Sequence, residues 1–232
     1  RWGGEVAMRI AVLGGTGPAG GALALRLADI GHQVRIGSRS AERAEEVCAE
    51  LKGRWPGRSL DLTGAANEDA AAWAGLVVVA TPWDAAASTA ASVAPALAGK
   101  VVISMANALT RLGNELVALI PPRGSIAAAV QAAVPDAHVA GAFHHVPAHE
   151  LGQLDDPVDC DVIICADHSG AAEATAGLVD AIPGLRSLRA GSLAAAAATE
   201  AFTAVLLQVN RRYKTRTTIR LHGLDKDVSE GS

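Results

Sequence analysis

An apolar run that leads directly into a glycine-rich loop is the feature that most constrains this chain. Residues 9–13 (Arg-Ile-Ala-Val-Leu) are typical of a strand buried on both faces. Residues 14–20 carry four glycines, and apolar side chains then recur at helical spacing as far as Gly31. A strand, a glycine loop and a helix in this order predict the start of a β-α-β unit.

The same alternation of strand and helix continues along the chain. Parallel strands are covered on both faces, which is why their apolar runs are continuous rather than alternating. We predict strands at 9–13, 33–36, 60–62, 76–80, 100–104, 138–143, 161–166 and 186–188. We predict helices at 19–30, 41–51, 67–73, 85–97, 114–120, 125–133, 170–182 and 192–209.

The glycine loop indicates a nucleotide site at the first strand–helix junction. Read from Gly15, the loop is G-x-G-x-x-G, in which the glycines permit a tight turn, a close approach of backbone to a pyrophosphate, and close helix–strand packing. The helix N-terminus adds free N–H groups for the phosphates. The alternative is a glycine turn that serves packing only. The predicted phosphate-binding residues are Gly15, Thr16, Gly17, Pro18, Ala19 and Gly20.

The end of the second strand indicates which dinucleotide binds. An NAD site usually has an acid about 20 residues after the glycines, which holds the ribose 2′-OH. This chain has Ser38 and Arg39 there, with Arg43 one turn further on and Thr16 in the loop. A hydroxyl and planar guanidinium groups suit phosphate oxygens, so we predict a 2′-phosphate pocket and therefore NADP. The alternative is a solvated helix start.

These features predict the α/β class, with a Rossmann-type doubly wound parallel sheet and a small C-terminal helical/αβ extension. We expect residues 8–190 to form the NADP-binding domain. Residues 191–232 are expected to form a C-terminal helix and a basic tail.

Composition argues against several classes of partner. The formal net charge is −4, and the chain has only four Trp, one Tyr and two Phe, so we expect no nucleic-acid partner. The longest apolar stretch, Leu193 to Leu207, contains Glu200, so we interpret it as a buried helix and expect no membrane partner.

The three cysteines indicate a reducing compartment. Cys160 and Cys165 are five residues apart around a predicted strand, so their side chains point to opposite faces and cannot easily pair. Cys48 lies in a predicted helix. We therefore expect three reduced, buried thiols and a cytoplasmic protein.

No convincing acid–base pair accompanies the nucleotide motif. A short-chain reductase needs a Tyr with a Lys four residues later, but Tyr213 is followed directly by Lys214 and has Thr217 four residues later. His145 and His149 have helical i, i+4 spacing but lack a third metal ligand nearby, so we expect no metal. We name no catalytic residue.

Polar and aromatic residues follow several predicted strands at the edge where ligands bind. Trp83 and Asn107 come after the strands at 76–80 and 100–104. His144 and His145 follow the strand at 138–143, and we expect them to line the ligand crevice. The alternatives are ordinary core packing for Trp83 and a surface loop for the histidines.

In combination, these motifs resemble the NADP oxidoreductases that use the deazaflavin coenzyme F420. The resemblance covers the chain from Met8 to about Leu224. The motifs are R-I-A-V-L-G-G-T-G at 9–17, G-S-R at 37–39, T-P-W at 81–83, F-H-H-V-P-A at 143–148, G-L-R-S-L at 184–188 and A-G at 190–191.

The resemblance implies direct hydride transfer between C4 of the nicotinamide and C5 of the deazaflavin. It implies a pyrophosphate site at 16–19 and a 2′-phosphate site at Ser38, Arg39 and Arg43. It places Trp83, Asn107 and Ala148 along the nicotinamide half of NADP(H). It further places the deazaflavin over Val146, with His144 nearby and the segment after Asn210 closing the acceptor pocket. We also expect a homodimer.

Two other functions remain open at this stage. One is an NADPH-dependent reductase of a small keto acid or imine, although only about 40 residues follow Ala190, too few for the helical second domain of such enzymes. The other is a non-catalytic NADP-sensing module.

The basic tail has two interpretations. One is that part of it attracts the anionic arm of a deazaflavin. The alternative is a structural role, through the helix dipole or through salt bridges to acids such as Asp155, Asp156 and Asp159. The basic residues are Arg211, Arg212, Lys214, Arg216 and Arg220.

Overall fold

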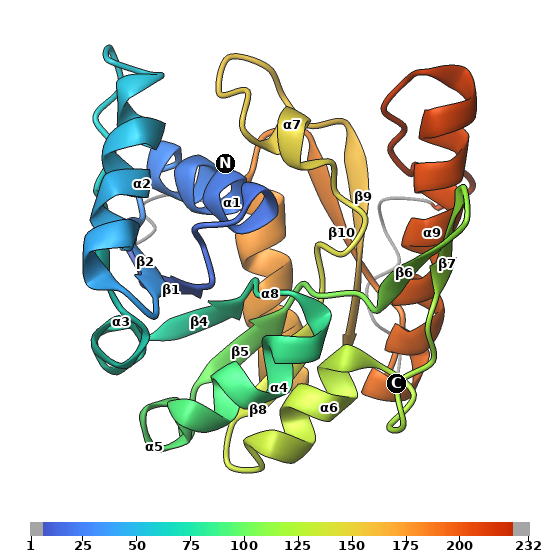
Figure 1. Cartoon of the computed structure of the whole chain (residues 1–232), viewed down its shortest axis with the longest axis horizontal. Helices are drawn as coiled ribbons and strands as arrows, with labels where there is room; N and C mark the ends of the chain where they lie inside the picture. Colours follow the sequence, from blue (N-terminus) through green and yellow to red (C-terminus); the bar gives the residue numbers. More distant parts are fainter. Residues whose placement is uncertain (1–6, 225–232) are drawn as a thin grey trace.

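A computed structural model describes residues 7–224 of the chain, so the last residues of the expected C-terminal domain lie outside the described part. Its centre is an eight-stranded sheet with the strand order β10-β9-β8-β5-β4-β1-β2-β3 (Figure 1). The strands are β1 Arg9–Leu13, β2 Gln33–Ser38, β3 Leu62–Ala66, β4 Leu76–Val79, β5 Val101–Ser104, β8 His138–Gly141, β9 Cys160–Ala166 and β10 Leu185–Arg189. A separate hairpin consists of β6 Leu109–Leu112 and β7 Glu115–Ala118.

Helices cover both faces of the sheet. They are α1 Pro18–Asp29, α2 Ala41–Gly53, α3 Asn67–Trp73, α4 Trp83–Ser92, α5 Ala94–Leu97, α6 Ile126–Ala133, α7 Ala148–Leu151, α8 Ser169–Ala181 and α9 Ala196–Tyr213, with a 3-10 turn η1 at Leu193–Ala195.

The strand order makes the sheet doubly wound, as predicted. From β1 the chain builds β2 and β3 on one side, then returns to build β4 and β5 on the other. All neighbouring strands in the described sheet run parallel except β8 and β9, which are antiparallel. The order therefore reverses between β1 and β4, and crevices at such reversals are where open α/β sheets bind ligands.

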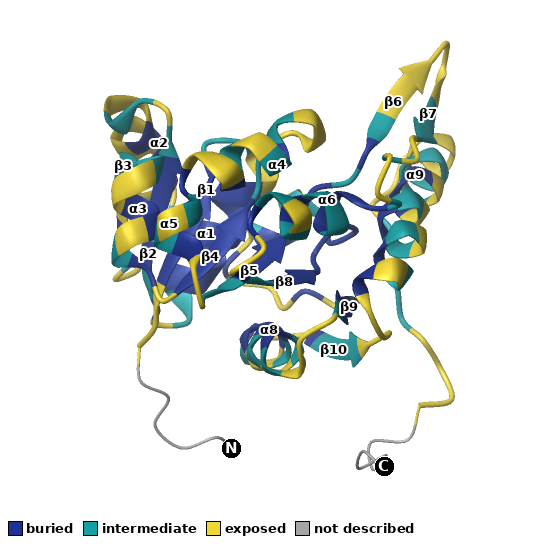
Figure 2. Ribbon diagram, turned by 90° about the horizontal axis from the view of Figure 1, so that it is seen from below, coloured by how far each residue is buried: buried dark blue, intermediate teal, exposed yellow. Residues whose placement is uncertain are grey.

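Two apolar layers hold the sheet between its helices. Because side chains alternate across a strand, Ile10 and Val12 of β1 face α1, α2 and α8, whereas Ala11 and Leu13 face α3 to α6. Figure 2 shows the strands as a buried band with helices on either side. Cys160 and Cys165 belong to opposite layers, which confirms that they point to opposite faces.

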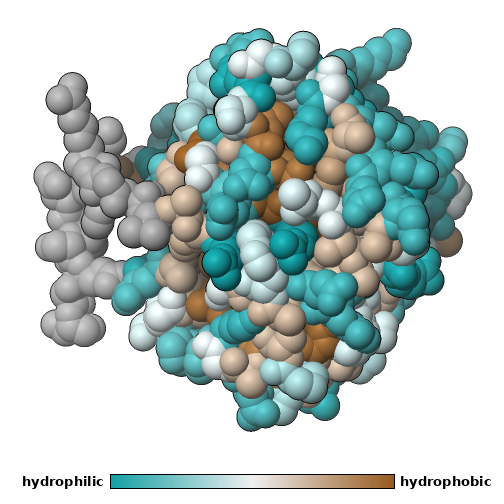
Figure 3. All heavy atoms as spheres, turned by 90° about the vertical axis from the view of Figure 1, so that its left-hand side faces the viewer, coloured by the Kyte–Doolittle hydropathy of each residue, from teal (hydrophilic) through white to brown (hydrophobic). Residues whose placement is uncertain are grey.

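Helix α2 shows how a surface helix is specified here. Ser40 caps its N-terminus by accepting a hydrogen bond from the backbone N–H of Arg43. Among its residues only Ala44, Val47, Cys48 and Leu51 are buried, which confirms the predicted solvated face. The side of the molecule that carries α2 is largely hydrophilic, with small scattered apolar areas (Figure 3).

Two helix predictions are wrong. Within the predicted helix at 114–120, Glu115–Ala118 form β7 of the hairpin instead, because a short apolar run fits either element by periodicity. Its two-residue turn starts at Gly113, with φ +58, so the Gly-Asn pair at 113–114 was the missed hairpin signal. The predicted helix at 85–97 is divided into α4 and α5, because Pro95 cannot donate the hydrogen bond that would continue α4.

The C-terminal helix is only partly buried, so the expectation of a buried helix is wrong. Within Leu193–Tyr213, 33% of the most apolar 18-residue window is buried. By length and composition this helix could cross a membrane, but helices in protein cores pass the same test, so the evidence is weak. The helix packs on the hairpin and on α6 (Figure 1).

Gly64 offers a test of the packing between β3 and α2. A Cβ at this position would overlap the backbone of Glu45, which cannot move without shifting the helix. We expect Gly64→Ala to lower the free energy of unfolding by about 1–3 kcal/mol, as overpacking does. Urea denaturation of the parent and the variant measures this difference in the free energy of unfolding.

The matched control is Gly53→Ala at the end of α2, where a Cβ meets nothing within 4 Å. This variant should be as stable as the parent or slightly more so. Equal stability of the two variants would contradict the packing argument.

Candidate functional site

The glycine loop sits at the reversal point of the sheet. Gly14 adopts φ +72, and a Cβ there would collide with Thr81, which follows β4. A Cβ on Gly20 would lie 2.8 Å from the Cβ of Ala80. Only glycine at these positions lets α1 approach the ends of β1 and β4, which sets the N-terminus of α1 over the crevice.

Gly17 differs from Gly14 and Gly20, because no contact within the protein requires a glycine at this position. A Cβ at Gly17 would meet its nearest atom, the carbonyl of Gly14, only at 3.7 Å. Gly17 is the N-cap of α1 and is followed by Pro18, and no side chain caps the first turn. The loop therefore leaves open backbone and helix N–H groups where a pyrophosphate would lie, so the residues present fit NADP.

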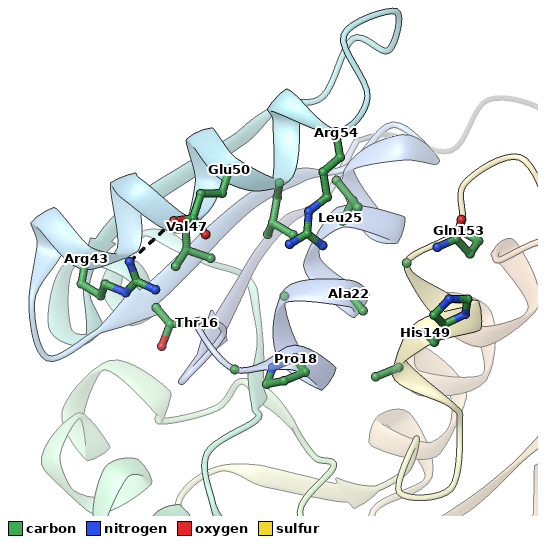
Figure 4. Close-up of a pocket in the computed structure, with 15 residues that line it drawn as sticks. Thr16, Pro18, Ala22, Leu25, Arg43, Val47, Glu50, Arg54, His149 and Gln153 are labelled. Atoms are coloured by element: carbon green, nitrogen blue, oxygen red, sulfur yellow. Dashed lines mark ion pairs between the residues drawn. The ribbon is translucent and has the colours of Figure 1, made fainter. Parts of the chain in front are cut away.

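A first cavity of about 410 Å³ opens between α1, α2 and α7 (Figure 4). Its apolar floor comes from side chains such as Ala22, Leu25 and Val47. Polar side chains, including Arg54 and Gln153, stand around it. Of the predicted cofactor-binding residues, it is lined by Thr16, Gly17, Pro18, Arg43 and Ala148.

The other predicted residues of the 2′-phosphate pocket lie outside this cavity. Ser38 ends β2, and Arg39 is exposed beside it. The guanidinium of Arg43 instead pairs with Glu46 at 2.9 Å, on the exposed surface of α2. A ligand phosphate would have to compete with this carboxylate for Arg43, and surface pairs of this kind are weak.

A second cavity of about 390 Å³ adjoins the first and shares Ala148 and His149 with it. It lies between the loop after β8 and the inner face of α9. The predicted residues Asn107, His144, Val146 and Ala148 all line it. Trp83 lines neither cavity and begins α4 at the surface.

The backbone after β8 is held in an unusual conformation. Phe143 is buried and has φ +64, the left-handed region that a bulky residue rarely adopts. The carbonyl of the next residue, His144, accepts hydrogen bonds from Asn107 Nδ2 at 2.9 Å and from Thr203 Oγ1 at 3.2 Å. The loop that lines the second cavity is thus fixed by Asn107, in the loop after β5, and by Thr203 of α9.

The two neighbouring histidines have different roles. His145 Nε2 lies 2.7 Å from the carbonyl oxygen of Asp161, so its ring holds the loop against β9. His144 is buried, and neither ring nitrogen has a hydrogen-bond partner. Burial, and after it the neighbouring His145, lower the pKa of His144 to about 3, and the nearby backbone of Ala106 and Met105 opposes this only in part. Its ring is therefore neutral near pH 7.

Buried polar atoms without partners follow several parallel strands at this edge. Thr81 Oγ1 follows β4, Ser104 Oγ ends β5, and Asn67 Oδ1 follows β3. His144 adds both ring nitrogens. Buried polar groups normally have partners, so this set marks an edge built to contact a polar ligand.

Helix α7 carries the residues that the two cavities share. Hydrogen bonds from Arg26 hold this helix in place. This buried guanidinium of α1 donates to the carbonyl oxygens of Leu151 at 2.9 Å and Glu150 at 3.0 Å. Burial lowers the pKa of Arg26, although Asp29 opposes this. Arg26 thus couples the glycine-loop helix to the wall between the two cavities.

Two residues of the basic tail, Arg216 and Arg220, have different surroundings. Arg220 donates to Asp159 and to the buried carboxylate of Asp161, which confirms the structural interpretation for this residue. Arg216 instead lines the second cavity and lies 3.7 Å from Glu150 of α7. Arg216 therefore stands at the mouth of the cavity.

Sequence reasoning missed the contribution of α9 to the second cavity. The lining residues recur at helical spacing along one face of the predicted helix. This spacing could have indicated that one face of the helix lines a cavity. The lining residues are Thr203, Leu206, Leu207 and Asn210.

Comparison with known proteins gives evidence about the family of this chain that is independent of the geometry of the site. Residues 9–108 match the family described as NADP oxidoreductase coenzyme F420-dependent. The chain is 37% identical to the F420-dependent NADP reductase of Methanocaldococcus jannaschii, over 94% of this chain and 100% of that protein. It is 37% identical to the F420-dependent NADP reductase of Methanothermobacter thermautotrophicus, over 94% of this chain and 96% of that protein.

A comparison with solved structures finds a protein of the same kind. A proposed F420-dependent NADP reductase from Arthrobacter sp. FB24 superposes with a TM-score of 0.78 at 27% identity, over 93% of this chain and 100% of that one. A pyrroline carboxylate reductase from Plasmodium falciparum shares the fold alone, with a TM-score of 0.53 at 15% identity, over 80% of this chain and 59% of that one.

The burial of His144 predicts a pH effect on stability. Below about pH 6.5 the unfolded chain binds a proton at this residue whereas the native state does not, so stability falls as the pH falls. We expect a contribution of about 1.4 kcal/mol per pH unit between about pH 6 and 4. His144→Asn should flatten the slope of unfolding free energy against pH in that range. Equal slopes, or an NMR titration of His144 near pH 6.5, would refute this.

Proposed function

This chain belongs to the F420-dependent NADP reductases, and we propose that it transfers a hydride between NADP(H) and the deazaflavin coenzyme F420. Similarity to curated members over nearly its whole length supports this activity. NADP(H) and the deazaflavin would both act as exchangeable substrates.

The observation that carries the proposal is the pair of cavities that meet at Ala148 and His149. We propose that the pyrophosphate of NADP(H) binds over 15–20, and that its 2′-phosphate binds at Ser38, Arg39 and Arg43. Trp83, Asn107 and Ala148 would line its nicotinamide half. The deazaflavin would occupy the second cavity, over Val146 and beside His144.

The protein's own contribution is alignment. When both are bound, NADPH would transfer a hydride from C4 of its nicotinamide to C5 of the deazaflavin, which leaves NADP+, and the proton that completes the reduced deazaflavin would come from solvent. Ala148, with its small side chain, lets two rings approach to the roughly 3–3.5 Å that such a transfer needs. His144 offers neutral hydrogen-bonding atoms in a buried site, and we assign no catalytic acid.

We propose a homodimer that works in the cytoplasm without nucleic-acid or membrane partners. The net charge of −4 and three free, buried cysteines support the compartment and the absence of nucleic acid. We also keep the division into 8–190 and 191–232, whose boundary lies in the turn between β10 and η1.

The activity is tested by mixing the protein with NADPH and coenzyme F420. We expect loss of the deazaflavin absorbance at the rate of NADPH oxidation, because the hydride passes directly between the two ligands. NADPH oxidation with a keto acid or an imine but not with F420 would favour the other reductase. Tight NADPH binding with no oxidation by any acceptor would favour an NADP-sensing module.

Nucleotide preference tests the 2′-phosphate site. Charge-assisted hydrogen bonds contribute about 1.5–3 kcal/mol each, so NADPH should bind more than about tenfold tighter than NADH. Arg39→Asp should weaken NADPH binding and spare NADH in fluorescence titrations. The control is Arg123→Asp, an exposed loop residue before α6, which should leave both affinities unchanged. Equal affinity of the parent protein for both nucleotides would contradict the assignment.

The divided tail predicts two different charge-reversal phenotypes. Arg216→Glu should raise KM for F420, and the effect should shrink with added salt, because Arg216 stands at the mouth of the second cavity and the acceptor is anionic. Arg220→Glu should instead lower Tm, because it leaves the buried Asp161 with fewer partners. If the rise in KM for F420 in Arg216→Glu does not change with salt, Arg216 has a structural role, as Arg220 does.

A further inference from the structure

The side chain of Asn67 is a polar group at the ligand edge that nothing in the fold uses. Asn67 follows β3 directly and begins α3. The next two residues, Glu68 and Asp69, are exposed, whereas Asn67 is partly buried. Its Oδ1 is buried without a hydrogen-bond partner, and its Nδ2 donates to no atom of the described residues. This amide therefore lacks the partners that a buried polar group normally has.

The amide of Asn67 lies against Gly37, the glycine of the G-S-R motif. A Cβ on Gly37 would lie 2.7 Å from Asn67 Oδ1 and 2.9 Å from Leu13 Cδ2. The φ of Gly37 is not positive, so its close approach to Asn67, and not its backbone conformation, requires glycine here. The other atoms nearest this Cβ are carbons of Leu13 and Ala70. Since Oδ1 is the buried end of the amide, Nδ2 is the polar atom left for a ligand.

The strand register puts this amide beside the proposed 2′-phosphate site. Strands β2 and β3 run parallel with Ser38 opposite Ala66, so Asn67 is one residue beyond the partner of Ser38. The carbonyl oxygen of Gly37 accepts a hydrogen bond from the backbone N–H of Gly14 at 3.0 Å, which ties the end of β2 to the glycine loop. Asn67 is therefore next to the path from the pyrophosphate loop to Ser38, along which the adenosine half of NADP(H) would lie.

We propose that Asn67 donates a hydrogen bond from Nδ2 to the 2′-phosphate of NADP(H) and helps to determine the preference for NADP(H) over NAD(H). The inference rests on the proposed function and adds a neutral donor to the proposed 2′-phosphate site. An NAD site uses an acid at this edge of the sheet to hold the ribose 2′-OH. A carboxylate would repel a phosphate, whereas an amide of nearly the same shape binds it without a charge.

The charges around Asn67 explain why a neutral donor matters there. The guanidinium of Arg43 is engaged by Glu46 at 2.9 Å, so a phosphate must compete for it. Glu68 and Asp69 add two acids in the first turn of α3, although both are exposed and are therefore screened by salt. No carboxylate of the described residues accepts from the amide of Asn67, so its N–H group is free for the phosphate.

Binding of two adenosine fragments tests the proposal without the nicotinamide or the acceptor. Adenosine 2′,5′-bisphosphate carries the 2′-phosphate and adenosine 5′-monophosphate lacks it, so the ratio of their Kd values, measured by calorimetry, isolates this group. We expect Asn67→Ala to weaken bisphosphate binding about tenfold, as loss of a hydrogen bond to a charged group does, and to leave monophosphate binding unchanged. Asn67→Asp should weaken bisphosphate binding further, because it adds a like charge beside the phosphate.

The matched control is Asn114→Asp in the exposed turn of the hairpin, which should change neither Kd. Asn67→Ala should keep at least the parent Tm, because it removes an acceptor that has no partner. An unchanged ratio of Kd values in Asn67→Ala, with or without a fall in Tm, would overturn the proposal. An equal loss of both ligands would also overturn it, and would assign the amide to the adenine or the ribose.

The fragments also separate this inference from the proposed function. A parent protein that binds both fragments equally well would refute the 2′-phosphate site as a whole, and the role of Asn67 with it. A parent that prefers the bisphosphate, with the same preference in Asn67→Ala, would refute the role of Asn67 alone. Neither result depends on hydride transfer to F420.

Discussion

The contact between the glycine loop and the end of β4 is the constraint on which the ligand edge depends. Gly14 and Gly20 lie so close to Thr81 and Ala80 that a methyl group has no room at either position. This closeness brings the N-terminus of α1 over the point where the strand order reverses. Through Arg26, the same helix also holds α7, so the nucleotide loop is linked to the wall between the two cavities.

Two buried carboxylates attach the C-terminal elements to this assembly. Asp161 accepts hydrogen bonds from Arg186, Arg220 and the backbone of Leu221. Burial alone would raise its pKa, but these bonds outweigh it and hold the pKa at about 2. Glu200 of α9 accepts from the first backbone N–H groups of α6, a favourable position at a helix N-terminus, although burial still raises its pKa to about 6. Together they orient α9 so that its inner face forms the second cavity.

Much of the fold was predictable because its elements are specified locally. The β1 run, the loop glycines and the N-cap Ser40 each act within a few residues, so periodicity and turn chemistry were sufficient to place them. The prediction of a helix at 114–120 was wrong because these residues suit a strand or a helix equally well. Only the turn at Gly113 distinguishes the two possibilities. Of the residues predicted for the site from the motifs or from the family resemblance, Thr16 lines the first cavity, and Asn107, His144 and Val146 line the second.

By itself the sequence determined the fold class, the glycine loop and the identity of the strands whose ends carry the predicted ligand-binding residues. Only the tertiary structure decided that Arg43 pairs with Glu46, that Arg220 is structural while Arg216 faces a cavity, and that α9 keeps one apolar side exposed. The physical reason is the range of the interactions. Turns and caps act between neighbours in sequence, whereas a partner for a charged side chain, or a cover for an apolar face, comes from whichever distant segment the packing brings close.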